Sequence, residues 1–198
     1  EGNSSYSRII SDSSNELNIY TGGGPHLAVT IDGSQKVGIG TNNPNTVGGG
    51  NGVHIIESST GASELHLTND TTGHASTDGL AIQMSGGTVN LMNRHAGAMR
   101  FFTAGGAASN ERLRITNVGR VYIGNPNGRS PGGLTPQLQV EGIDVGTSSM
   151  SLTRNSANSG GPNITFNKTR GTAVGADTIV ANGDTLGILH FVGSDGND

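Results

Sequence analysis

Apolar and polar residues alternate along the chain in runs of about four to six residues. A period of two places the apolar side chains on one face of a β-strand and the polar ones on the other. The runs recur about every ten residues, separated by Gly-Gly, Asn-Gly and Asp-Gly pairs that favour tight turns. The pattern predicts an all-β chain of short strands. The clearest apolar pairs are Leu65/Leu67, Leu80/Ile82, Val89/Leu91, Met99/Phe101, Leu113/Ile115 and Val121/Ile123.

The order of strands and turns occurs more than once along the chain. Residues 37–40 (VGIG) match residues 121–124 (VYIG) at an offset of 84. Residues 27–30 (LAVT) match residues 113–116 (LRIT) at an offset of 86. Tyr20 matches Phe102 at an offset of 82. Such self-similarity at a near-constant period is the sequence signature of a repeat protein.

The repeat divides the chain into three parts, with a unit of about 85 residues. Residues 1–44 are interpreted as the end of one β module, residues 45–130 as a complete module, and residues 131–198 as the start of a third. The chain begins and ends within a module, so we expect it to be part of a longer protein. Each copy is better described as a small multi-strand module than as one coil of a solenoid.

Glycines mark the turns of the repeated phrase. Gly33 and Gly119 are expected to make the turn between its two strands. Gly40 and Gly124 end the second strand, where a glycine suits a tight turn or a close approach of the backbone.

An Asn-Pro pair follows each terminal glycine. Pro44 and Pro126 are expected to stop the strand, because proline has no backbone N–H for a β-ladder. The phrase therefore closes one module and starts a connector, and these four glycines and prolines (Gly40, Pro44, Gly124 and Pro126) define the length of the repeat.

Composition indicates that one copy of the chain does not bury enough side-chain volume to fold alone. Glycine accounts for 34 of 198 residues, aromatic residues for 4%, and tryptophan is absent. Glycine loses the most backbone freedom on folding and contributes no side chain to a core. Other copies of the same chain are the expected source of the missing buried surface.

Charge excludes several classes of partner. The net charge is −4, and the eleven Lys and Arg residues are scattered. This distribution provides neither the basic stripe of a nucleic-acid-binding protein nor a polybasic membrane signal. Since no apolar run reaches the roughly 20 residues of a membrane helix, no membrane insertion is expected.

Two phrases, LAVTIDGSQKVGIGTNNP and ERLRIT..GRVYIGNP, resemble the shaft of tailed-bacteriophage tail fibres. GDTLGILHFVGSDG at residues 183–196 is similar to the fibre region upstream of an endosialidase-type intramolecular chaperone. The resemblance implies an elongated, intertwined homotrimer located in the virion and outside the cell. It also implies a structural role: holding a tip that binds a host glycan or protein, together with other tail proteins.

Two alternatives to this structural role stay open. One is a trimeric tailspike depolymerase that cleaves host polysaccharide, and the other is a bacterial surface adhesin stalk. A depolymerase needs paired carboxylates, for which Glu57, Glu64, Asp70 and Asp78 are available. Each lies beside a strand edge or a turn, so we expect no enzyme activity and assign no catalytic residue.

The sequence contains no metal or cofactor motif. The histidines are single and far apart, without the HExxH spacing of zincins. Asp195 and Asp198 lack the terminal Glu of a calcium loop and are expected to be turn residues. We therefore expect no metal and no cofactor. The histidines are His26, His54, His66, His74, His95 and His190.

Tyr20 and Phe102 occupy equivalent positions of the repeat. Phe101 and Phe102 are adjacent and so point to opposite faces of a strand. We expect Phe101 to be buried and Phe102 to be exposed in a single chain. A repeated aromatic position suggests an interchain contact for Tyr20 and Phe102, although it also suits a platform for stacking sugars.

Overall fold

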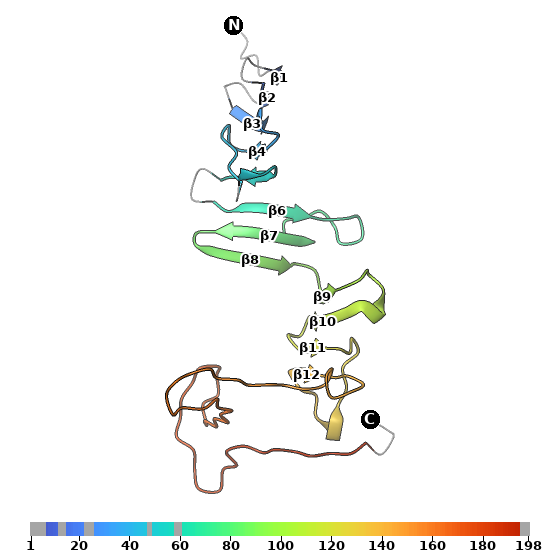
Figure 1. Ribbon diagram of the computed structural model, residues 1–198, viewed down its shortest axis with the longest axis vertical. Helices are drawn as coiled ribbons and strands as arrows, with labels where there is room; N and C mark the ends of the chain where they lie inside the picture. The colour runs from blue at the N-terminus through green and yellow to red at the C-terminus, as the bar shows by residue number, and fades with distance from the viewer. Residues whose placement is uncertain (1–6, 12–14, 22–25, 47–48, 58–60, 195–198) are drawn as a thin grey trace. The chain divides into compact units, whose positions relative to one another are not determined.

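In this computed structural model, residues 7–11, 15–21, 26–46, 49–57 and 61–194 are described, and they fold almost entirely as β-strands, turns and irregular chain (Figure 1). Helical structure there is limited to short 3₁₀ turns, among them Ala108–Asn110 and Pro131–Gly133. The all-β expectation is thus confirmed. The strands are β1 Arg8–Ser11, β2 Leu17–Thr21, β3 His26–Ile31, β4 Val37–Ile39, β5 Val53–Ile55, β6 Ser63–Leu67, β7 Leu80–Ser85, β8 Thr88–Asn93, β9 Met99–Phe102, β10 Glu111–Ile115, β11 Val121–Ile123 and β12 Leu138–Val140.

The chain forms two compact units, Glu1–Ala96 and Gly97–Asp198. The first contains a five-stranded sheet, β1 to β5 in sequence order, and a three-stranded sheet, β6-β7-β8. The second contains the four-stranded sheet β9 to β12, also in sequence order (Figure 1). All neighbouring strands are antiparallel except β4–β5 and β11–β12, which are parallel.

The last four strands of the five-stranded sheet are paired in the same way as β9 to β12. Val29 lies opposite Ile39, and Leu113 lies opposite Ile123. Strand β3 therefore matches β10 at an offset of 84, and the expected offset of 86 is wrong by two residues. A shift of two keeps every apolar side chain on its face, so the alternation alone does not determine the register.

A β-bulge recurs at the same place in both sheets. The register shifts between Ile19 and Tyr20 in the β2–β3 pair, and between Glu111 and Leu113 in the β9–β10 pair. The extra residue turns the strand locally and changes which side chains share a face.

The β3–β4 turn differs from the expectation. Gln35, with φ of 64°, occupies the left-handed position that Gly119, with φ of 81°, occupies in the β10–β11 turn. The backbone N–H of Gln35 donates to Asp32 O, as that of Gly119 donates to Thr116 O. Gly33 is therefore not the equivalent of Gly119, and the left-handed residue in this turn is a glutamine.

Gln35→Gly is expected to stabilise the five-stranded sheet by about 0.5–1 kcal/mol. A left-handed conformation costs a non-glycine residue about 1–2 kcal/mol, which glycine avoids. Glycine also loses more backbone entropy on folding, and this loss offsets part of the gain. The midpoint of urea unfolding measures the effect. Ser34→Gly is the control: Ser34 has no left-handed backbone, so this substitution should destabilise slightly. A lower midpoint for Gln35→Gly would contradict the assignment.

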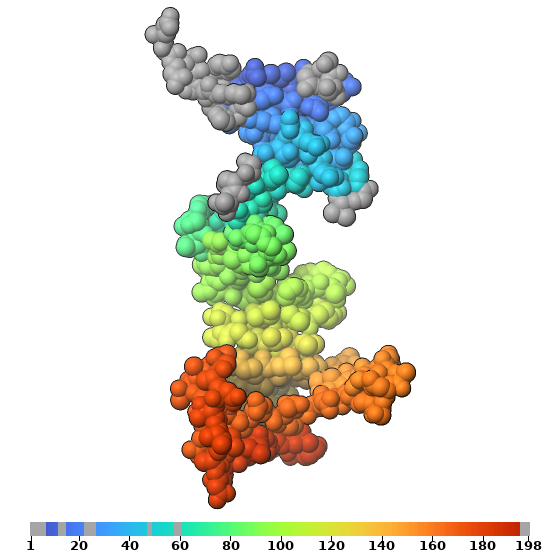
Figure 2. All heavy atoms as spheres, turned by 90° about the vertical axis from the view of Figure 1, so that its left-hand side faces the viewer, coloured from blue at the N-terminus to red at the C-terminus, as the bar shows by residue number. Residues whose placement is uncertain are grey.

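The segment from Glu141 to Ser194 forms no strand and runs as loops, coloured orange to red in Figures 1 and 2. One of these loops is closed by Arg170, whose Nε and Nη2 donate to the carboxylate of Asp184 at 2.8 Å each. These hydrogen bonds lower the pKa of Asp184 to about 2. Elsewhere in the segment many apolar side chains are exposed, among them Ile143 and Val174.

Candidate assembly interface

Most apolar side chains of the five-stranded sheet lie on one face, in two rows that cross the strands. This face is open in the single chain, where 62% of the surface of Val53 is exposed. Parallel and antiparallel registers both keep facing residues on the same side of a sheet. One row is Ile9, Ile19, Val29, Ile39 and Ile55, and the other is Leu17, Ile31, Val37 and Val53.

Strands β9 to β12 form the same two rows in the second unit. Phe101 belongs to one of them, and 44% of this residue is exposed. The rows are Met99, Ile115, Val121 and Leu138, and Phe101, Leu113, Ile123 and Val140.

The three-stranded sheet also leaves an apolar face open. Leu65, Ile82 and Leu91 face one another across its strands, and Met84 faces Val89. Together with Val53 and Ile55 of β5, residues of this face line a shallow hollow of about 390 Å³. We call the three apolar faces together the open apolar faces of the chain.

The centre of the opposite face of the five-stranded sheet is polar and covered. Thr30 is fully buried there, and its hydroxyl donates to Asn18 Oδ1 at 2.6 Å. Gly38 lies beneath the connector that follows β4, where a Cβ would come within 2.5 Å of Thr41 O and 3.4 Å of Pro44 Cβ. The single chain therefore covers its polar face with its own connector and leaves its apolar face open.

In the second unit the covered face holds charges. Glu111 is 4% exposed, and its carboxylate accepts hydrogen bonds from Nε and Nη2 of Arg114 at 2.6 and 3.0 Å. Arg100 Nη1 lies 3.6 Å away. The hydrogen bonds from Arg114, together with the charge of Arg100, lower the pKa of Glu111. Arg114 and Arg100 face each other at the positions of this sheet that correspond to Thr30 and Asn18 in the five-stranded sheet.

Gly40 and Gly124 both have left-handed backbones, with φ of 77° and 89°. A Cβ on Gly40 would come within 2.6 Å of Ile56 O, and one on Gly124 would overlap the carbonyl oxygen of Glu141. Both glycines thus stand where the chain turns out of the sheet and passes close to the residue after the parallel strand. These contacts supply the turn and the close approach for which a glycine is suited.

Pro44 and Pro126, expected to be equivalent, occupy different places. The N–H of Asn43 donates to Thr41 Oγ1, and that of Asn127 donates to Asn125 Oδ1. This correspondence aligns Pro44 with Gly128, two residues after Pro126.

In this alignment, the sizes of the strand residue and the connector residue that contact each other are reversed between the two sheets. Pro44 packs on Gly38, whereas Gly128 packs on the buried ring of Tyr122, the residue that replaces Gly38. A small residue therefore meets a large one in each copy, with the roles reversed between strand and connector.

Tyr20 and Phe102 lie on the covered side of their sheets, opposite the open apolar rows. The guanidinium carbon of Arg8 lies 4.5 Å from the centre of the Tyr20 ring, and that of Arg100 lies 5.1 Å from the Phe102 ring. Phe102 is half-buried and Phe101 is more exposed, the reverse of the expectation for a single chain. The interchain role of Tyr20 and Phe102 stays a prediction.

The four acidic residues considered for catalysis all contact neighbouring groups of the fold. Glu64 accepts a hydrogen bond from Gln83 at 2.8 Å, and the Asp78 carboxylate accepts one from the N–H of Ala75 at 3.0 Å. Asp70 lies 3.0 Å from His74 within the β6–β7 loop. The fourth candidate, Glu57, donates its backbone N–H to Ser63 Oγ.

Within the described residues, no group of three or more His, Cys, Asp or Glu side chains is placed to hold a metal ion. Two of the histidines contact the backbone: His54 Nδ1 accepts from the N–H of Asn45, and His66 Nε2 lies 2.5 Å from Asp78 O. Asp195 and Asp198 lie outside the described residues.

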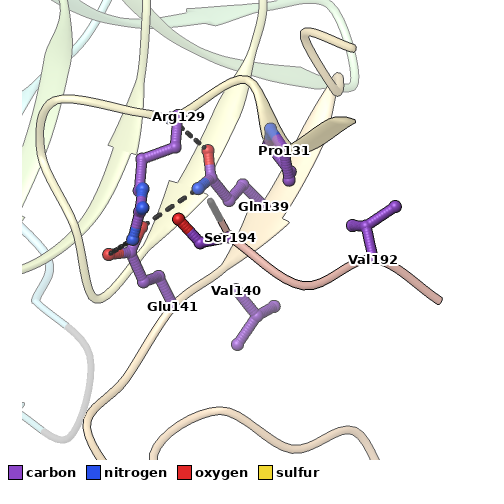
Figure 3. A pocket seen from close by; sticks show the side chains of 7 residues that line it. All are labelled: Arg129, Pro131, Gln139, Val140, Glu141, Val192 and Ser194. Atoms are coloured by element: carbon purple, nitrogen blue, oxygen red, sulfur yellow. Dashed lines mark hydrogen bonds and ion pairs between the residues drawn. The ribbon is translucent and has the colours of Figure 1, made fainter. Parts of the chain in front are cut away.

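A hollow of about 280 Å³ lies beside β12 (Figure 3). Its polar side chains interact with one another. The carboxylate of Glu141 accepts a hydrogen bond from Gln139 at 3.1 Å and forms an ion pair with Arg129 at 3.6 Å. The N–H of Arg129 donates to Gln139 Oε1, as the N–H of Asn45 donates to His54 in the first unit. These groups hold the connector against the last strand.

Sequence reasoning missed the buried Glu111 and its arginines. The apolar alternation in ERLRI assigns Glu111 and Arg114 to opposite faces, because they are three residues apart. The bulge at Arg112 brings them to the same face. A Glu beside two Arg residues in a chain that is only 13% charged is the signal that could have drawn attention to them.

Among the residues that the structure describes, no helix is long and apolar enough to cross a membrane. No protein-family model matches this chain, and a search of the curated proteins finds no match either.

Proposed function

We propose that the chain is a structural, non-catalytic segment of a homotrimeric viral tail fibre, which holds and presents a tip that binds the host receptor. The observation that carries the proposal is the set of open apolar faces, present on all three sheets. A fold that covers its polar face and exposes its apolar face lacks a partner, because burying apolar surface is the main driving force for folding.

Copies of the same chain fit these faces. Each of the three sheets presents Ile, Leu or Val side chains on an open face that the same sheet of another copy can cover. A thin core shared between chains also accounts for a sequence with 34 glycines and 4% aromatic residues. The number of three chains, the virion location and the tail partners come from the resemblance to tail-fibre shafts.

Sedimentation equilibrium tests the assembly. The expected mass is three times the 20.1 kDa of one chain. Ile123→Asp should reduce this mass to that of a monomer, because it places a charge in an apolar row. Val118→Asp is the matched control: Val118 is 61% exposed, more than Ile123 at 38%, but lies outside the rows. A monomeric parent chain, or an Ile123→Asp variant that stays assembled, would refute the proposed interface.

Activity measurements separate this role from that of a depolymerase. The assembled chain is expected to release no oligosaccharide from host surface glycan. Release that is lost in Glu64→Gln, with the sedimentation mass unchanged, would support the depolymerase instead.

A further inference from the structure

Part of the third module repeats the sequence of the β6–β7 hairpin. Residues 149–152 correspond to Glu64–Leu67 of β6, with Leu152 at the position of Leu67. Residues 164–167 correspond to Leu80–Gln83 of β7, with Ile164 at the position of Leu80. In the first unit, β6 and β7 form an antiparallel ladder in which Leu67 faces Leu80. In the third module the two segments form no strands.

Two substitutions in the loop explain why this hairpin does not close. Gly79 has φ of 75° and passes so close to Leu67 that a Cβ would overlap the Leu67 carbonyl oxygen. Asn163 replaces Gly79 and carries a Cβ. The preceding residue, Asp78, donates its N–H to Ala75 O, whereas Pro162 at that position has no N–H to donate.

The two segments are nevertheless patterned as strands. Met150 and Phe166 are 70% and 61% exposed, and Leu152 and Ile164 are exposed as well. Among the described residues, no hydrogen bond between backbone groups involves residues 149–168. Exposed alternating apolar side chains on an unpaired backbone are the features of a strand whose partner is missing.

We infer that residues 149–152 of one copy pair with residues 164–167 of a second copy, antiparallel and in the register of β6–β7. Leu152 then faces Ile164 of the second copy, and Met150 faces its Phe166. The partner is a second copy because the complementary strand is encoded in this chain but is blocked from pairing within it. Exchange of an identical element between copies is a low-cost route to oligomers. The inference rests on the proposed assembly.

Cysteine cross-linking tests the pairing on a clean background, since the chain has no cysteine. Ser151 and Thr165 correspond to His66 and Ala81, which face each other in the ladder. In the double variant Ser151→Cys/Thr165→Cys, oxidation or a short bis-maleimide should link the chains into covalent trimers under denaturing conditions. Either single variant should stay at monomer mass in that assay.

A second variant restores the blocked hairpin. Adding Pro162→Asp and Asn163→Gly to the two cysteines should convert most of the interchain product into a bridge within one chain. The off-register pair Ser151→Cys/Asn163→Cys is the control and should give less interchain product than the in-register pair.

The outcomes separate this inference from the proposed function. If the parent chain sediments as a trimer but the in-register cysteines bridge within one chain, or not at all, the strand exchange is wrong and the assembly stands. If Ser151→Cys alone forms covalent dimers, the register is wrong, because the segment then pairs with itself. A monomeric parent chain refutes both the exchange and the assembly.

Discussion

Gly124→Ala is expected to lower the free energy of unfolding of the β9–β12 sheet by about 3 kcal/mol or more. Two costs add at this position. The φ of 89° is a left-handed conformation that disfavours alanine, and the new Cβ would overlap the carbonyl oxygen of Glu141. To relieve the overlap, the N–H of Glu141 must move away from Ile123 O, which it now meets at 2.9 Å, so that β11 and β12 separate.

Gly119→Ala separates these two costs. Gly119 has a similar φ of 81°, but no atom lies within 4 Å of the position that its Cβ would take. The loss should therefore be only about 1 kcal/mol, the cost of the left-handed conformation alone. Urea unfolding of the two variants beside the parent chain measures the difference. Equal losses would show that the approach to Glu141 is not a tight contact.

The alternation of apolar residues predicts which side chains share a face, but not which face the chain covers. It correctly groups Leu113 with Ile115, and Val121 with Ile123, on one side of a sheet. The expectation that Phe101 is buried failed in the single chain because the covering connector packs on the opposite side. Which side a loop covers depends on contacts such as that of Gly128 with Tyr122, which have no periodic signature.

The turns show the same limit at the level of single residues. Gly33 is the residue that suits a left-handed turn position, yet Gln35 adopts the left-handed conformation. The side chain of Asp32 accepts hydrogen bonds from the N–H groups of Ser34 and Lys36 and thereby holds the turn in this register. The local hydrogen-bond pattern, rather than the position of a glycine, decides where the chain reverses.

The order of the strands and the approximate offset between the matching sheets could be predicted from the sequence, whereas the open apolar faces could not. Low side-chain volume predicts that other copies contribute buried surface, and this stays a prediction. The surface that can receive them, centred on rows such as that of Ile39 and Ile55, required the strand register. The blocked hairpin also required the structure, because the importance of Gly79 lies in its approach to Leu67.

Acidification is expected to destabilise the second unit through Glu111. Because Arg114 and Arg100 lower its pKa in the folded state, the unfolded chain binds more protons as the pH falls below the ordinary glutamate pKa of about 4.3. The stabilisation is therefore fully present above that pH and is lost as the pH falls through the lowered, folded-state pKa. Unfolding midpoints measured between pH 7 and pH 3 follow this loss.

Glu111→Gln removes the charge and should cost about 1–2 kcal/mol at pH 7, because the mostly buried Arg114 loses its counter-ion while solvent screens the half-exposed Arg100. The contribution of residue 111 to the pH dependence below about 4.3 should also disappear. Asp177→Asn, which removes an exposed carboxylate from the same unit, is the control and should change stability by less than about 0.5 kcal/mol. If both variants unfold alike at pH 7, the arginines do not depend on Glu111, and the covered face is held by its packing alone.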